Sequence, residues 1–155
     1  MTSHHLAQLN VARLREPLDH PDLKPFVDWL AIVNGDAEAA PGFVWRLVDD
    51  EGIGATAIRP AWASDDLIVN LTVWETVETL RDFFLSGRHL EIMRRRREFF
   101  RPHDGPYLVL WWVDAGHIPE LDEAKTRLDH LTSVGPSPDA FTLRTPFLAP
   151  AVATP

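Results

Sequence analysis

The feature that most constrains the fold is a strand pattern that runs directly into a long amphipathic helix within residues 69–100. Apolar residues alternate through residues 67–74, as in a strand with one apolar face and one mixed face. From residue 76 the apolar residues recur at helical spacing. Ser86 and Gly87 interrupt that spacing, so we expect a kink there or a break into two helices.

The other periodic segments complete the order strand, helix, strand, strand, helix, strand. Further strands are predicted at residues 4–14, 43–48 and 107–114, and further helices at residues 22–40 and 120–131. This order predicts an α+β, ferredoxin-like split βαβ fold, in which a four-stranded antiparallel sheet carries helices on one face. We expect a single domain over residues 1–155, with the ferredoxin-like core at 4–118 and a C-terminal helix and extended arm at 119–155.

One segment of the chain has a weaker pattern. Residues 49–54 are predicted to form a turn, and the chain from there to residue 66 is predicted to form either a long hairpin connection or an extra short strand.

In the C-terminal arm, Phe141 and Leu143 are expected to pack on the body of the protein.

The two faces of the predicted sheet differ in chemistry. One face is apolar, with Leu67, Val69 and Leu71 among its members, and we expect the helices to cover it. The opposite face carries Asn10, Asn70, Thr72 and Trp74, together with either the Trp45 set or the Arg46 set of the second strand. A face this aromatic is expected to pair with a second copy or to line a cavity.

Composition excludes several classes of function. The net charge of -8 argues against nucleic acid as a partner, and the absence of cysteine excludes disulfides and thiolate chemistry. The seven histidines lack metal-ligand spacing, and no glycine-rich phosphate loop is present, so we predict no metal and no evident cofactor. The longest apolar run, residues 108–113, is too short to span a bilayer, and the N-terminus has no signal-peptide pattern. These features predict a cytoplasmic protein without membrane partners.

Five segments of the sequence resemble one known family. They are HLAQLNVARL, AAPGFVWRL, IVNLTVWETVETLRDFF, HLEIMRRRREFF and YLVLWWVDAGHIP, within about residues 4–148. Together they resemble the bacterial family named domain of unknown function 3291. The resemblance implies the dimeric α+β barrel superfamily, which includes the antibiotic-biosynthesis monooxygenases. It also implies a homodimer in which two sheets close a barrel and each protomer holds a small-molecule pocket between its sheet and its second helix.

A comparison with the heme-degrading monooxygenases of that superfamily bears on the cofactor. Their pattern uses an Asn in the first strand and a Trp and a His on the second helix, and Asn10 matches the first position. The resemblance puts Phe83 at the Trp position and Met93 at the His position, which argues against heme degradation. His89 lies one helical turn before Met93, so a differently placed heme stays an alternative.

His89 and Asn10 are the candidate catalytic residues. A histidine at a helix bend can act as a general acid or base near neutral pH, although a surface histidine beside Arg88 and Glu91 is the alternative interpretation. Asn10 lies in the middle of a strand, where asparagine is disfavoured, so it either has a partner or function or faces solvent. With Asn70 it could orient a carbonyl or enolate oxygen.

Other polar and aromatic residues are candidates for binding a substrate. Four consecutive arginines cannot all point one way on a helix, so we expect Arg96 or Arg97 to turn inward, toward Glu98, Asp114 or a ligand anion. The tryptophans could line a cavity for an aromatic ligand, with ordinary core packing as the alternative. The predicted substrate-binding set is Asn70, Trp74, Trp45, Met93, Arg96 and Trp112.

Three functional hypotheses follow from this pattern. The first is a small enzyme that acts without an evident cofactor on a small apolar or aromatic substrate, by oxygenation, cyclisation or isomerisation. The second is a ligand- or heme-binding dimeric module without turnover. The third is a structural dimer whose aromatic residues are all core.

Overall fold

A five-stranded antiparallel sheet, with the long strand β1 (His4–Leu14) at its centre, organises the fold. The computed structural model describes residues 3–49, 55–56 and 58–152. On one side of β1 lies β3 (Leu67–Trp74), paired through eight residues, and β2 (Phe43–Arg46) lies beyond β3. On the other side of β1 lies β5 (Leu108–Asp114). The spatial order β2-β3-β1-β5 is that of the predicted ferredoxin-like sheet.

A short additional strand distinguishes the sheet from the predicted four-stranded one. β4 (Phe100–Arg101) pairs with the last residues of β1, beyond the segment that β5 covers. The chain pairs briefly with β1 as it leaves the helical region and then turns into β5.

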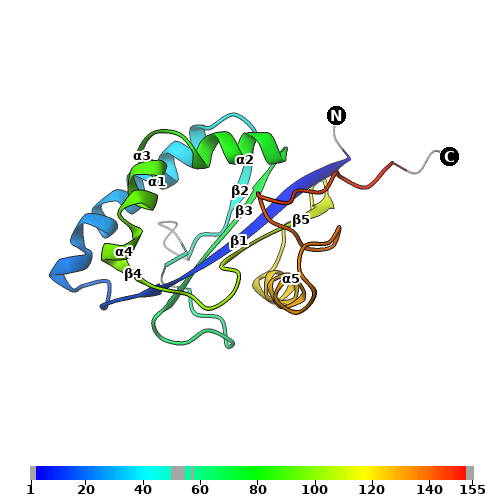
Figure 1. The fold of residues 1–155 in the computed structure, drawn as a ribbon. Helices are drawn as coiled ribbons and strands as arrows, with labels where there is room; N and C mark the ends of the chain where they lie inside the picture. The colour runs from blue at the N-terminus through cyan, green and yellow to red at the C-terminus, as the bar shows by residue number, and fades with distance from the viewer. Residues whose placement is uncertain (1–2, 50–54, 57, 153–155) are drawn as a thin grey trace.

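The helices lie on both sides of this sheet (Figure 1). The helices that come before β5 in the chain lie on one side, and the C-terminal helix lies on the other. Their bounds are Pro21–Leu23 for the short 3-10 helix η1, Lys24–Ala39 for α1, Val77–Phe84 for α2, Gly87–Arg94 for α3, Arg96–Phe99 for α4 and Leu121–Val134 for α5.

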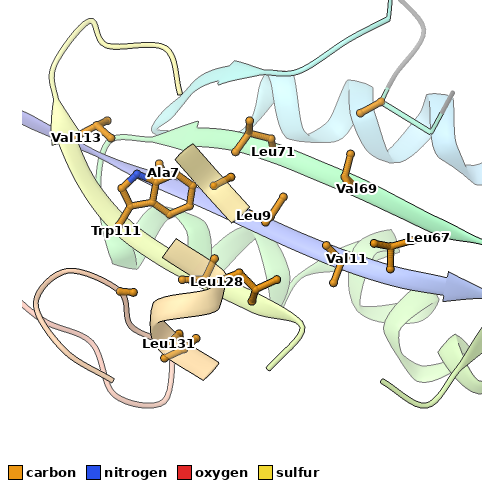
Figure 2. Close-up of a cluster of buried hydrophobic side chains, with 14 residues drawn as sticks. Ala7, Leu9, Val11, Leu67, Val69, Leu71, Trp111, Val113, Leu128 and Leu131 are labelled. Carbon is orange, nitrogen blue, oxygen red and sulfur yellow. The ribbon is translucent and has the colours of Figure 1, made fainter. Parts of the chain in front are cut away.

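The prediction of which face the ferredoxin-like helices cover is wrong. Figure 2 shows the apolar face, on which Leu9, Val69 and Leu71 pack with Leu128 and Leu131 of α5. Residues 55, 58, 62 and 63 of the long connection pack against the same cluster. This face therefore takes the C-terminal helix, and α1 to α4 cover the mixed face instead.

The second helical region is broken where the sequence predicts. α2 begins with a capping box between Thr76 and Thr79 and ends at Phe84, and α3 begins at Gly87, whose φ is +52°. A second interruption, at Arg95, separates α3 from α4. These breaks let the chain bend around the mixed face of the sheet and set His89 in the first turns of α3.

The C-terminal arm packs on the body of the protein as expected. Phe141 is fully buried and exchanges two backbone hydrogen bonds of 2.8 Å with Leu110 of β5. Leu143 and Phe147 pack against the cluster that contains Trp74. Within the connection from β2 to β3, the predicted turn at residues 49–54 falls almost entirely outside the described residues, and the described residues up to 66 contain no strand.

The turn between α1 and β2 generates a stability prediction. Gly42 has a φ of +80°, and an added Cβ would lie 2.5 Å from the Thr79 side chain. We expect Gly42→Ala to lower the free energy of unfolding by about 2 kcal/mol or more, because both the backbone conformation and the contact disfavour a side chain.

Gly35→Ala provides the matched control. A Cβ at Gly35, inside α1, meets nothing within 4 Å, so this change should raise the free energy of unfolding by about 0.5–1 kcal/mol. Chemical denaturation measures both variants, and equal effects of the two changes would contradict the account.

Candidate functional site

A cavity of about 150 Å³ lies between the mixed face of the sheet and helices α1 to α3. Its walls are mostly apolar and aromatic, with a few polar groups among them, which is the usual make-up of a small-molecule site. The apolar wall includes Phe26, Leu30, Val33, Trp74, Phe83, Phe84, Ile92, Met93 and Phe100. The polar groups include Gln8, Asn10, Asn34, Arg46, Asn70, Thr72 and His89.

A chain of side-chain hydrogen bonds crosses the floor of this cavity. The indole Nε1 of Trp74 donates to Thr72 Oγ1 at 2.9 Å, and Thr72 Oγ1 donates to Gln8 Oε1 at 2.7 Å. Gln8 Nε2 then donates to Asn10 Oδ1 at 2.7 Å. Trp74, Thr72 and Gln8 are 1%, 7% and 1% exposed, so the bonds satisfy polar groups that water does not reach. We call these four residues the polar relay.

The direction of the polar relay is fixed by its chemistry. An indole N–H can only donate, so Thr72 has to accept from Trp74 and to donate its own hydrogen to the carbonyl oxygen of Gln8. The amide nitrogen of Gln8 then meets the carbonyl oxygen of Asn10. The Asn10 NH2 group is therefore the free end, with no hydrogen-bond partner among the described residues. It can donate to a ligand acceptor.

Asn70 lies directly across from Asn10 on the neighbouring strand. Its side chain is exposed and lines the same cavity, so the two amides lie where the cavity reaches solvent. Asn10 thus has a side-chain partner, which is one of the two interpretations of its mid-strand position, and Asn70 stays available for a ligand.

His89 lies in an aromatic part of the cavity wall. Its ring stacks on Phe84 with centroids 4.6 Å apart and lies 5.0 Å from the ring of Phe83, which in turn stacks on Trp74 at 5.2 Å. Its Nδ1 atom lies 3.4 Å from the Phe84 carbonyl oxygen. Since a carbonyl only accepts, Nδ1 carries the hydrogen in this contact, and the neutral ring keeps its lone pair on Nε2.

Burial lowers the pKa of His89 below its ordinary value, and the contact with the Phe84 carbonyl opposes this only in part. The neutral imidazole is therefore the dominant form at neutral pH. A neutral imidazole with a free Nε2 lone pair can accept a proton from a bound molecule.

The cavity brings together most of the predicted site but not all of it. His89, Asn10, Asn70, Trp74 and Met93 all line it. Trp45, Trp112 and Arg96 do not line it.

A register shift explains the position of Trp45. Between Phe43 and Trp45 the pairing of β2 with β3 is irregular, so Trp45 is opposite Val73 and packs against the apolar cluster. Arg46 is opposite Thr72 and lines the cavity instead, with its Nε 2.6 Å from Glu38 Oε1.

Trp112 and the arginines lie at opposite ends of β1. Trp112 lies under the C-terminal arm and donates from Nε1 to the Phe147 carbonyl at 2.9 Å. Arg96 lines a hollow that adjoins the cavity. Arg96 and Arg97 are both exposed, so the expected inward turn of one of them is wrong. Neither forms an ion pair among the described residues, since Glu98 pairs with Arg95 at 2.7 Å and Asp114 lies 3.5 Å from His4. The alternative partner, a ligand anion, stays a prediction.

Sequence reasoning missed the role of Gln8 and Thr72. The sequence pattern places Thr72 on the mixed face without a role and does not single out Gln8, yet the two are opposite each other in the β1–β3 register, next to the Asn10–Asn70 pair. Two adjacent cross-strand pairs of polar residues within apolar strands are the signal that could have revealed the relay.

The described part of the chain contains no cluster of metal-binding side chains and no helix that could span a membrane. Over residues 3–49, 55–56 and 58–152, no group of three or more His, Cys, Asp or Glu side chains is arranged to hold a metal ion. Within the same ranges, no helix combines the length and the apolar character needed to cross a membrane.

The environment of His89 predicts its titration. Its pKa should lie below the ordinary value of about 6.5. At a pH between the folded-state pKa and this ordinary value, the folded state therefore binds fewer protons than the unfolded state. The contribution of His89 to stability is then complete above that value and is lost as pH falls. Titration of the ring by NMR measures the pKa directly.

Substitutions beside the His89 imidazole test whether burial is the cause of its lowered pKa. Phe84→Ala uncovers one face of the imidazole and should raise the pKa of His89, whereas Leu85→Ala, at a side chain that is 63% exposed, should leave it unchanged. A wild-type His89 that titrates at or above its ordinary value would contradict the proposed burial.

Comparison with known proteins gives the family and the fold. The family model described as domain of unknown function DUF3291 matches residues 5–155. No curated protein matches the sequence.

Solved structures of low sequence identity share the arrangement of the elements. A protein from Nitrosomonas europaea, provisionally named an antibiotic biosynthesis monooxygenase, is 7% identical with a TM-score of 0.50, over 77% of this chain and 98% of that chain. A conserved protein from Methanosarcina mazei Go1 is 10% identical with a TM-score of 0.50, over 72% and 93%. SnoaB, a cofactor-independent oxygenase from Streptomyces nogalater, is 16% identical with a TM-score of 0.47, over 75% and 98%.

The match to the family model covers nearly the whole chain, and the similar structures agree on an α+β arrangement of an antiparallel sheet and helices. The chain belongs to the DUF3291 family and has the fold of the antibiotic-biosynthesis-monooxygenase-like proteins.

Proposed function

We propose that this protein is a small enzyme that binds a small apolar or aromatic molecule in the cavity and acts on it by acid–base chemistry, without a cofactor evident in the sequence. The observation that carries this proposal is that one apolar cavity contains both a proton acceptor and an oriented hydrogen-bond donor. His89 is the acceptor, and the NH2 group of Asn10, at the end of the polar relay, is the donor.

The size and walls of the cavity support an aromatic substrate. A cavity of about 150 Å³ in a protein core holds one benzene molecule, so one ring fits here without displacing side chains. Phe83, Phe84 and Trp74 offer flat or edge contacts to such a ring.

The proposed first step is removal of a proton beside a carbonyl group or from a phenol. His89 Nε2 takes the proton, and the electron pair left behind moves onto the substrate oxygen, where Asn10 donates a hydrogen bond. Because the donor is already oriented by Gln8, it need not reorganise as the charge develops. Return of the proton to another carbon gives an isomerisation, attack of the enolate on a second carbonyl gives a cyclisation, and reaction with dioxygen gives an oxygenation.

A ligand- or heme-binding role without turnover is the second candidate. The observation that favours it is that His89 and Met93, two side chains able to ligate heme iron, line the same cavity one helical turn apart. Against it, a porphyrin contains four rings where the cavity has room for about one. Titration with hemin separates the two candidates, and we expect no shift of the Soret band.

The proposed enzyme is tested by finding the substrate and then removing its proposed machinery. Native mass spectrometry of the protein purified from its own host identifies a retained ligand, and turnover of that compound is then measured. His89→Gln should lower kcat by about 10²- to 10⁴-fold. Asn10→Ala should lower it by about 10²- to 10³-fold.

His130→Gln serves as the matched control, because His130 is an exposed histidine on α5, on the other side of the sheet. It should leave turnover unchanged. Full turnover in His89→Gln would disprove the catalytic role of that residue.

We also propose the homodimer that the family resemblance implies. Since α5 and residues 55, 58, 62 and 63 cover the apolar sheet face within one chain, the second copy has to pack against this cover rather than directly on the strands. Native mass spectrometry should give twice the chain mass of 17.5 kDa. A mass of 17.5 kDa at micromolar concentration would contradict the dimer.

A further inference from the structure

A second hollow, of about 470 Å³, adjoins the cavity and shares four of its lining residues. The shared residues are Asn10, Ala12, Met93 and Phe100. The cavity and this hollow therefore meet at the free end of the polar relay. A ligand held by Asn10 can extend into the hollow.

The hollow is lined by basic side chains. Its wall includes Arg15, Arg96, Arg97, Arg101 and His103, together with Tyr107. In a chain with 23 acidic and 15 basic residues, four arginines in one hollow run against the overall charge. We call this the arginine hollow.

The arginines of this hollow lack carboxylate partners. Among the described residues, no carboxylate oxygen lies within 4.0 Å of Arg15, Arg96, Arg97 or Arg101. Arg13, Arg46, Arg88 and Arg95 each pair with an acid. Other arginines outside the hollow, such as Arg94 and Arg144, also have no carboxylate within 4.0 Å among the described residues. What distinguishes the hollow is that four such arginines line one concave surface.

The chain builds the hollow from two separate segments. Arg15 Nε donates to the Arg97 carbonyl at 2.7 Å, and Arg101 donates to the Arg15 carbonyl at 3.4 Å. The pairing of β4 with the end of β1 brings these segments together. Arg95 is held away by Glu98 and by the Trp29 ring, 5.1 Å from its guanidinium carbon, so Arg96 and Arg97 are the members of the arginine run that line the hollow.

We propose that the arginine hollow binds an anionic group, a carboxylate or a phosphate, of the same ligand whose apolar ring occupies the cavity. This inference rests on the proposed function and deepens it, because it makes the substrate an aromatic acid or an aryl phosphate. Guanidinium groups bind such oxyanions through paired, charge-assisted hydrogen bonds. The bound anion also relieves the repulsion among neighbouring arginines. Arg96 and Arg97 are assigned the main role, since Arg15 and Arg101 also border a neighbouring hollow that contains Glu16, Asp65 and Asp66.

The experiment compares matched probes by calorimetry or NMR titration. Benzoate and phenyl phosphate carry the ring and the charge, benzamide carries the ring alone, and inorganic phosphate carries the charge alone. At low salt we expect benzoate, phenyl phosphate or both to bind at least about tenfold more tightly than benzamide. This difference in affinity, the advantage of the charged probes, should shrink as the salt concentration is raised. The preferred anion distinguishes a carboxylate ligand from a phosphate ligand.

Variants that remove equal charge inside and outside the hollow test whether Arg96 and Arg97 cause the tighter binding of the charged probes. Arg96→Gln with Arg97→Gln should abolish the advantage of the charged probes and leave benzamide binding unchanged. Arg94→Gln with Arg144→Gln removes the same charge from two exposed residues outside the hollow, so the advantage should persist.

The outcomes separate this inference from the proposed function. Benzamide binding with no added affinity for benzoate or phenyl phosphate would overturn the anion site and leave the cavity proposal standing. Equal binding of inorganic phosphate and phenyl phosphate, with no binding of benzamide, would instead overturn the aromatic cavity and with it the combined ligand. A charged-probe advantage that survives Arg96→Gln with Arg97→Gln would overturn the assignment to these arginines.

Discussion

The hydrogen bonds of Gln8 are the constraint on which the site depends. A side-chain amide that is 1% exposed in a central strand has to have its oxygen and its nitrogen satisfied by the protein. Thr72 satisfies the oxygen and Asn10 accepts from the nitrogen. Thr72 is opposite Gln8 in the antiparallel register of β1 and β3, and Asn10 shares a face with Gln8 because it lies two residues further along β1. A slip of that register by one residue would turn the Thr72 side chain to the opposite face and leave the Gln8 oxygen without this partner. The register that closes the core thus also keeps the polar relay intact.

The breaks in the helical region are the second structural requirement. A continuous helix from Thr76 to Phe100 would run straight away from the sheet, because each residue adds 1.5 Å along its axis. The interruptions before Gly87 and at Arg95 let α3 and α4 follow the sheet back to the end of β1. His89 then lines the cavity, and Arg96 and Arg97 line the hollow beside it.

Periodicity predicted the strands well because each has a clear alternating pattern. The bounds of β1 and β3, and the break after Phe84, agree with the expectation. The pattern could not decide which helices cover which face, since α5 and the earlier helices all have an apolar side. Trp45 was assigned among the ligand-binding residues because the irregular pairing after Phe43 is not visible in the sequence.

The candidate site was only partly accessible to sequence reasoning. Asn10 and His89 stand out because each is an unusual residue for its position. The relay depends instead on which residues are opposite each other across two strands, and Gln8 and Thr72 look ordinary until that register is known. The arginine hollow depends on segments more than 80 residues apart in the sequence, such as Arg15 and Arg97.

The central claim is that the relay holds the Asn10 NH2 group ready to donate to an oxygen in the cavity. The most direct measurement follows the side-chain amide resonances of Asn10 by NMR during titration with acetophenone, which combines one aromatic ring with one carbonyl. The account predicts saturable downfield shifts of the Asn10 amide protons in the wild type that are much smaller in Thr72→Val, where the relay is interrupted. Binding of acetophenone with unperturbed Asn10 resonances would contradict it.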